Sequence, residues 1–337
     1  MKDELEHPTD LCTVSGTLSP DAVGWSRWPL HRCNLSGHRL RKKRWNYWAV
    51  QTERYFFCAG IADLDYAANA FVYLVDIRRK LVTERSVVTP FGRGIILGEH
   101  VNSTAAFRNR RITFAETHDE NVTSLLVTCD NFDGGDRLSA AVRVIYPDDF
   151  ETLGVVVPMD HEHFQYTSKH IAVPVAGRVR IGRNEIPFEG IDAFACLDFG
   201  RGVWPRNTVW NWGAASGYVE NSNFGLNLGG KWTDGTGATE NAIFIDGRLI
   251  KIYEDLEWSY DGGDFIKPWR VRAPRSGDVD LLFEPIVERK TGVDALVVRS
   301  HVHQVFGIWS GTVRGERGET IEIPYLFGWA EEHRARW

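Results

Sequence analysis

The chain has 337 residues, with 39 basic and 45 acidic side chains and a formal net charge of −6. Hydrophobic residues at 43% and charged residues at 25% are typical of a folded protein, and the length suits one large domain or two medium ones. The negative balance argues against a broad nucleic-acid-binding surface. No apolar run reaches the roughly 18 residues that would indicate a membrane-spanning helix.

The five cysteines are scattered and include no C-x-x-C pair, which argues against a zinc knuckle, a dithiol redox site or a disulfide framework. The first residues, MKDELEHPTDLC, are charged and contain no apolar signal-peptide core. We therefore expect a cytoplasmic protein. The oligomeric state cannot be predicted from the sequence.

No cofactor or metal is expected. The stretch 225–231 matches G-x-x-x-x-G-K, but Trp232 follows where a phosphate loop needs Ser or Thr. Two His-x-His pairs, at 161/163 and 301/303, could each present two imidazoles on one face of a strand. Exposed or hydrogen-bonded histidines are the commoner outcome, so we predict no metal site.

Short segments rich in β-branched and aromatic residues predict strands along most of the chain. In chain order they lie at 55–66, 71–77, 124–129, 140–146, 171–181, 241–253, 279–288, 295–309 and 319–331. Turns are predicted at 133–135, 246–247 and 261–263, where Asp precedes Gly. Helix candidates are few, at 330–336 and near 3–10. The pattern predicts an all-β protein with antiparallel barrels or sandwiches.

An internal repeat divides the sequence into two halves. Trp45-Asn46-Tyr47-Trp48 resembles Trp210-Asn211-Trp212, and similar pairs of segments follow each cluster, 59–63 with 228–232 and 69–73 with 241–245. The interval is longer in the second half, which we attribute to an inserted loop at 231–239. We predict an N-terminal domain over residues 1–190 and a C-terminal domain over 191–337. The first aromatic cluster is expected to be structural.

The segment 198–212 concentrates charged, amide and aromatic side chains. Such a density could line a ligand pocket, with the indoles packing the ligand and the polar groups orienting it. The candidates are Asp198 as an acid or base, and Arg206, Trp210, Asn211 and Trp212 as ligand-binding residues. Alternatively, Arg206 pairs with Asp198 and the indoles fill the core.

The loop 231–241 is the second polar segment. Asp234 and Glu240 are candidate catalytic residues, while Lys231, Trp232 and Asn241 are candidates for ligand binding and charge stabilisation. The alternative is a Gly-rich loop in which Asp and Thr cap their own backbone. Further upstream, Tyr166 and Lys169 could form an acid pair or simply end a surface strand; we retain Tyr166 as a ligand-binding candidate.

Several long segments resemble one bacterial family. They are RKKRWNYWAV, FQYTSKHIAVPVAGRVRIG, LDFGRGVWPRNTVWNWGAASG, FGLNLGGKWTDGTGATENAIFIDGRL and LFGWAEEHRARW. The chain is identified by them as a member of the domain of unknown function 2804 family. More distantly it resembles the carotenoid hydratase, or hydroxyneurosporene synthase, and attachment-protein group. That resemblance implies two tandem lipocalin-like β-barrels and no catalytic residue, since no short hydratase motif aligns.

Three functions remain open. The resemblance implies that an apolar or amphiphilic small molecule is bound, with cofactor-free hydration, isomerisation or cyclisation by acid–base chemistry if the protein is an enzyme. The tryptophans also allow a carbohydrate-active enzyme, a hydrolase or lyase, with two carboxylates across an indole-lined cleft. The third option is a non-catalytic lipid or isoprenoid carrier. A site is expected in the second half, facing the first.

Overall fold

The computed structural model describes residues 3–294 and 299–336. Within these residues nearly all regular structure is strand, and the one helical element is the single turn η1 (Pro20–Ala22). The predicted all-β class is confirmed. In the same part of the chain, no helix is long and apolar enough to cross a membrane.

Most strands of the first half form one 14-stranded antiparallel sheet. Its members are β2 (Trp25–Ser26), β4 (Lys42–Gln51), β5 (Tyr55–Asp63), β6 (Ala67–Asp76), β7 (Leu81–Pro90), β8 (Ile95–Ile96), β9 (Ala105–Arg108), β10 (Ile112–Asp119), β11 (Val122–Asp133), β12 (Asp136–Ile145), β13 (Leu153–Pro158), β14 (Phe164–Ile181), β15 (Asn184–Phe188) and β16 (Phe194–Val203). Two short strands, β1 (Thr9–Asp10) and β3 (His31–Arg32), form a separate parallel pair.

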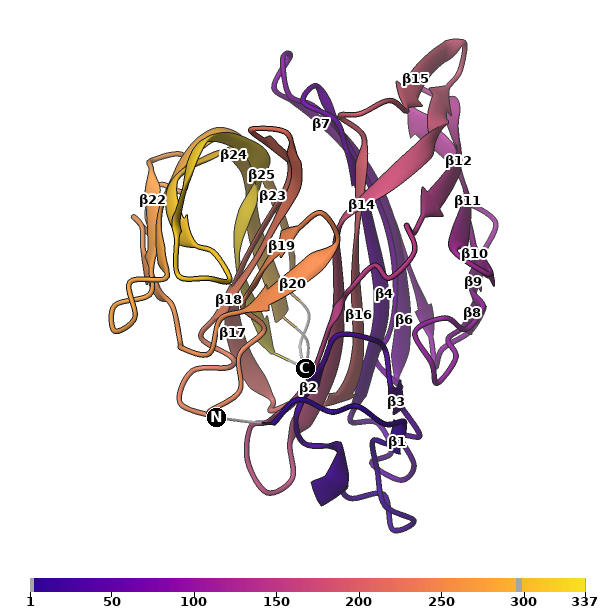
Figure 1. Cartoon of the computed structure of the whole chain (residues 1–337). Coiled ribbons are helices and arrows are strands. Elements are labelled where there is room, and N and C mark those ends of the chain that lie inside the picture. The colour runs from indigo at the N-terminus through magenta and orange to yellow at the C-terminus, as the bar shows by residue number, and fades with distance from the viewer. Residues whose placement is uncertain (1–2, 295–298, 337) are drawn as a thin grey trace.

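A second antiparallel sheet of nine strands follows. It contains β17 (Asn207–Val219), β18 (Ser222–Gly230), β19 (Ala242–Ile245), β20 (Arg248–Lys251), β21 (Glu257–Ser259), β22 (Trp269–Arg272), β23 (Val279–Asp294), β24 (Arg299–Arg314) and β25 (Thr320–Arg336). Figure 1 shows two curled sheets, with the second, coloured from red-brown through orange to yellow, against the long strands β4, β14 and β16 of the first. The prediction of two tandem lipocalin-like antiparallel β-barrels is confirmed, and each barrel is an open, curled half-barrel sheet.

The two sheets repeat one topology. Each contains a four-stranded meander, β4–β7 in the first and β17–β20 in the second. The first strand of each meander also pairs with the last strand of its own sheet, β4 with β16 and β17 with β25. Trp45 and Trp210 lie on these two equivalent first strands, so the sequence repeat has a counterpart in the topology.

The chain passes from one sheet to the other between Val203 and Asn207. The predicted domain boundary, between residues 190 and 191, lies earlier in the sequence than this passage. Strand β16 follows that boundary, yet it pairs with β4 and β14 of the first sheet. The division into two domains stays a prediction.

The helix predicted at 330–336 is wrong. These residues continue β25, which pairs with both β17 and β24. Residues 3–10 are not helical either, and include β1. The predicted strand 295–309 is observed from Arg299 as part of β24, while 295–298 lie outside the described residues.

The central strands of the first sheet are buried on both faces. On β4, Trp48 and Val50 point into the first half-barrel, whereas Ala49 packs against the second sheet. We call the core between the sheets the seam; it joins Ala49 with Trp212 and Trp329 of the second sheet. A strand buried on both faces loses the apolar–polar alternation of a half-exposed one.

Strand β14 contains a bulge between His170 and Val173, where Ala172 has a positive φ of 56°. Before the bulge, odd-numbered residues of β14 face the seam and Tyr166 faces the first half-barrel. After it, the odd-numbered Val175 and Val179 face the half-barrel. A bulge adds one residue to a strand, which explains the reversal.

Candidate functional site

A buried ammonium group between two carboxylates lies in the seam. Lys169 Nζ is 2.9 Å from Asp198 Oδ1 and 3.1 Å from Glu240 Oε2. The side chain of Lys169 is 4% exposed and that of Glu240 is 2% exposed. The first sheet contributes Lys169 and Asp198, and the second contributes Glu240, so the ion cluster joins the two halves.

Strand register and a glycine place these groups. Lys169 on β14 lies directly opposite Asp198 on β16, so their side chains leave the sheet on the same face. Glu240 comes just before β19, and its side chain packs over the backbone of Gly229. A Cβ added to Gly229 would lie 2.4 Å from Glu240 Cγ. The site therefore requires glycine at position 229.

Each carboxylate also accepts a hydrogen bond from an indole N–H. Trp45 Nε1 donates to Asp198 Oδ2 at 3.0 Å, and Trp232 Nε1 donates to Glu240 Oε1 at 2.7 Å. Lys169 Nζ lies 4.3 Å from the ring centroid of Trp212, a cation–π geometry. The ion cluster is thus enclosed by three indoles.

The charges in this cluster depend on each other. Burial acts to lower the pKa of Lys169, but the charges of Asp198 and Glu240 outweigh it, and the net pKa is raised. Lys169 is therefore an ammonium at every physiological pH. Burial raises the pKa of Glu240, against the opposing effects of Lys169 and the Trp232 hydrogen bond.

Two further tryptophans extend the aromatic wall. Trp204, in the link between the sheets, has its ring centroid 5.8 Å from that of Trp45, 5.7 Å from Trp210 and 5.1 Å from Trp232. Its Nε1 donates to Gln165 Oε1 at 2.7 Å. Trp45 and Trp210 are partly exposed, so this end of the wall reaches solvent.

A second indole–carboxylate pair repeats the first. Trp210 Nε1 donates to Glu331 Oε1 at 3.0 Å, as Trp45 donates to Asp198. The register is equivalent: Trp45 lies opposite Gly200 and Trp210 opposite His333, with the accepting carboxylate two residues earlier on the partner strand in both cases. The repeat of the sequence therefore produces two matched acidic groups.

Glu331 differs from Asp198 in its charge environment. It lies directly opposite Trp212 in the sheet register, and no ammonium or guanidinium group among the described residues forms an ion pair with it. Burial raises the pKa of Glu331 to about 7, with Arg289 and Lys169 acting against that effect. A large fraction of Glu331 is therefore protonated at neutral pH. We name Lys169, Asp198, Glu240, Glu331 and the five surrounding indoles (Trp45, Trp204, Trp210, Trp212 and Trp232) the seam cluster.

Hydrogen-bonded phenols lie next to Trp212. The ring of Tyr47 packs edge-on against Trp212 at 5.5 Å, and its hydroxyl is 2.7 Å from that of Tyr73. Tyr73 donates to Gln304 Oε1 at 2.7 Å, and Gln304 Nε2 donates back to Tyr47 at 3.2 Å. Burial raises the pKa of both phenols well above the usual value, so they remain neutral donors.

Five residues predicted from the sequence belong to the seam cluster. They are Asp198, Trp210, Trp212, Trp232 and Glu240. Asp198 pairs with Lys169; the predicted alternative partner, Arg206, is exposed in the link between the sheets.

Lys231 and Asn211 lie together in a different place. Asn211 Nδ2 donates to the hydroxyl of Tyr260 at 3.1 Å, and Lys231 Nζ lies 2.8 Å from Glu332 Oε2. The hydroxyl of Tyr260 also bonds to Glu332. Asn211 and Glu332 alternate with Trp210 and Glu331 along their strands, so this group lies on the opposite face of the second sheet.

The other three candidates are apart from the seam cluster. Asp234 is exposed and its Oδ1 accepts the backbone N–H of Lys231 at 2.9 Å, as the loop-capping alternative anticipated. Asn241 is buried and bonds to Gly229 N and Glu254 O, which fixes the loop. Tyr166 is buried inside the first half-barrel, with its ring 4.5 Å from that of His31.

The site predicted from the sequence lacks Lys169, Glu331, Trp45 and Trp204. The alternation Gln165–Thr167–Lys169 was a usable signal for Lys169, because it places three polar groups on one strand face. The helix predicted at 330–336 gives no reason to place Glu331 beside Trp212, whereas the observed strand does. The sequence predicts a structural role for Trp45, yet its indole N–H donates a hydrogen bond to Asp198.

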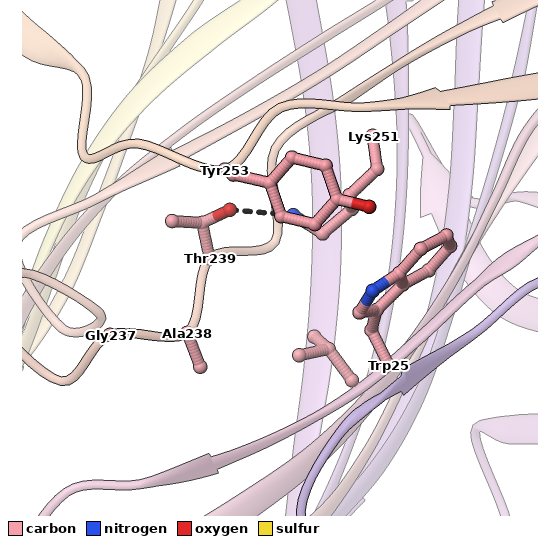
Figure 2. A pocket seen from close by; sticks show the side chains of 7 residues that line it. Trp25, Gly237, Ala238, Thr239, Lys251 and Tyr253 are labelled. Atoms are coloured by element: carbon pink, nitrogen blue, oxygen red, sulfur yellow. Dashed lines mark hydrogen bonds between the residues drawn. The ribbon is translucent and has the colours of Figure 1, made fainter. Parts of the chain in front are cut away.

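A small cavity of about 20 Å³ lies where the 231–241 loop meets the N-terminal segment. Figure 2 shows Trp25, Thr239, Lys251 and Tyr253 around it. Lys251 Nζ donates to Thr239 Oγ1 at 2.6 Å and to two backbone carbonyls, and burial lowers the pKa of Lys251 to about 7. A volume of this size holds roughly one water, far below that of a drug-sized ligand.

The histidine pairs form local contacts. His163 Nδ1 is 2.7 Å from Asp160 Oδ2, and His303 Nδ1 is 2.6 Å from Glu288 Oε1. Across residues 3–294 and 299–336, no three His, Cys, Asp or Glu side chains are grouped as a metal site would require.

The fold and the seam define a class of protein: tandem, lipocalin-like curled sheets with ionisable groups buried between them. The sequence matches, over residues 2–337, the family described as Domain of unknown function (DUF2804), and the chain belongs to this family. Among curated proteins, no sequence match was found.

Solved structures share the fold at low sequence identity. CghA with Sch210972 is 12% identical, with 88% of this chain and 89% of that chain covered and a TM-score of 0.53. CghA without a named ligand gives 12% identity, 88% coverage of both chains and a TM-score of 0.50. Kievitone hydratase from Nectria haematococca is 13% identical, with 87% and 88% covered and a TM-score of 0.47. We use the CghA similarity as evidence for the fold.

Proposed function

We propose that the protein binds an apolar or amphiphilic small molecule at the seam cluster and transforms it by cofactor-free protonation, leading to hydration, isomerisation or cyclisation. The observation that carries the proposal is the place of Glu331: a buried carboxyl group, its pKa raised by burial to about 7, directly opposite Trp212 in the sheet register and close to the charges of Lys169 and Asp198. The similar fold of CghA, whose structure contains Sch210972, supports small-molecule binding by this architecture.

Glu331 is the proposed acid. Its Oε1 accepts the indole N–H of Trp210, which fixes the carboxyl group and leaves its proton available on the other oxygen. An acid with a pKa near the ambient pH combines a high protonated fraction with a sufficient tendency to give up the proton. In the proposed step, the Glu331 proton adds to a double bond of the substrate and Glu331 becomes a carboxylate.

Asp198 and Glu240 are proposed to stabilise the positive charge that this step creates. Each is held by an indole and by Lys169, so their carboxyl groups are positioned before the reaction begins. The faces of the surrounding indoles provide further attraction for a cation. Water addition, or loss of a neighbouring proton, then completes the reaction and returns a proton to Glu331.

Deuterium incorporation tests the acid role. Native mass spectrometry of the protein purified from its own host identifies the retained ligand, which is then incubated with the enzyme in D₂O. Proton transfer to carbon adds deuterium to the ligand. We expect Glu331→Gln to slow incorporation about 10²-fold or more, while Glu332→Gln, the adjacent residue on the other face, retains it. An equal rate in Glu331→Gln would remove Glu331 as the acid.

The two alternative functions have less support. A glycosidase needs open space between its carboxylates, whereas Asp198 and Glu240 both contact the ammonium of Lys169, which fills that space. A carrier without chemistry needs no ionisable group with a shifted pKa. The raised pKa of Glu331 therefore favours an enzyme over a carrier.

A further inference from the structure

An apolar and basic surface lies at one edge of the first sheet, away from the second sheet. It comprises the turn after β7, strand β8 and the β9–β10 turn (Figure 1). Phe91 is 77% exposed and Ile96 is 63% exposed, high values for such large apolar side chains. We name this surface, formed by Phe91, Arg93, Ile96, Arg108, Arg110 and Arg111, the β8 edge patch.

Backbone contacts hold the parts of the β8 edge patch together. Arg108 N donates to Gly94 O at 2.8 Å, and an added Cβ on Gly94 would lie 2.5 Å from Arg108 O. Ile96 pairs with Ala106 in the register of β8 and β9. The two loops are therefore packed against each other.

Four arginines of the patch carry uncompensated charge. Arg93, Arg108, Arg110 and Arg111 are exposed, and none forms an ion pair with a carboxylate among the described residues. The acidic groups nearby are already paired. Asp63, beside Gly92, pairs with Arg44, and Asp130, whose backbone N–H bonds to Arg111 O, pairs with Arg137 at 3.2 Å. The patch is thus strongly positive on a chain whose net charge is −6.

We propose that the β8 edge patch docks the protein onto an anionic lipid bilayer. Exposed Phe and Ile side chains insert at the headgroup boundary, while surrounding arginines bind lipid phosphates. A second copy of the chain does not fit, since two such patches face to face would bring eight arginines together. This surface is separate from the seam cluster, so the proposal does not depend on the proposed function.

Vesicle co-sedimentation tests the proposal. The probes are vesicles of phosphatidylcholine alone and of phosphatidylcholine with phosphatidylglycerol. We expect binding to the anionic vesicles only, and weaker binding at high ionic strength. Each arginine replaced by glutamine should lower the partition coefficient about fivefold, and the double variant Phe91→Ser/Ile96→Ser should also weaken binding.

Two controls keep the outcome interpretable. Leu282→Ser removes an exposed apolar side chain of the second sheet, and Arg78→Gln/Arg79→Gln removes two exposed charges from the turn after β6. Both controls should bind like the wild type. Absence of wild-type binding, equal binding to neutral vesicles, loss of binding in the Arg78/Arg79 variant, or equal affinity for single-stranded DNA would each overturn the proposal.

Discussion

Replacing Glu331 by glutamine should change how the stability of the protein depends on pH. Burial raises the pKa of Glu331 from 4.5 to about 7, so the folded state holds a proton that the unfolded state has released between these values. Its stabilising contribution is complete below pH 4.5 and is lost as pH rises through 7. The shift corresponds to about 3 kcal/mol in the free energy of unfolding. Glutamine is close in shape to the protonated acid and does not titrate.

The measurement is urea unfolding, followed by tryptophan fluorescence at pH 5, 6, 7 and 8. The stability of the wild type relative to Glu331→Gln should fall by about 3 kcal/mol in total, mostly before pH 7. Glu332→Gln is the matched control. Hydrogen bonds from Arg334, Lys231 and Tyr260 outweigh burial and lower the pKa of Glu332 to about 2, so that variant should show no such slope above pH 5. A constant difference between wild type and Glu331→Gln across this range would refute the assignment of a buried acid.

Three further predictions concern stability, measured by chemical unfolding at pH 7. Lys169→Met should cost about 3–5 kcal/mol because it leaves buried carboxylates unpaired, and adding Asp198→Asn should restore part of the loss; strictly additive effects would contradict the ion cluster. Gly200→Ala should cost about 1–3 kcal/mol, since its Cβ would lie 2.1 Å from Trp45 Cε2, whereas Gly262→Ala, in open space, should be near neutral. Gln51→Leu should cost about 1–3 kcal/mol because Gln51 Nε2 bonds to Ser216 O and Phe327 O of the second sheet; an unchanged midpoint would show that this contact between sheets is dispensable.

The fold was largely predictable because its strands and turns have local sequence signals. The turn Asp246–Gly247 connects β19 and β20 with positive φ at both residues, as its sequence indicates. The segment 330–336 shows where local signals fail. Its Ala, Glu and Arg residues favour a helix, but pairing on both sides with β17 and β24 makes it a strand.

The candidate site was predictable only in part because its residues meet through strand pairing. The density of tryptophan and acidic residues pointed to Asp198, Glu240 and the second aromatic cluster. The contact of Lys169 with Glu240 joins two sheets and has no local sequence signature. Asp234 shows the converse. The polar loop that contains it predicts a functional side chain, yet the carboxylate of Asp234 accepts a backbone N–H of its own loop.

The bulge in β14 limits which insertions and deletions this strand can accept. Before the bulge the odd-numbered residues of β14 face the seam, and after it the odd-numbered residues face the first half-barrel. A one-residue deletion at Ala172 would move one segment by a position relative to its partners, which exchanges inward and outward side chains. Either Lys169 would turn away from Asp198, or Val175 and Val179 would leave their core. Insertions and deletions in β14 are therefore expected to be tolerated only in pairs.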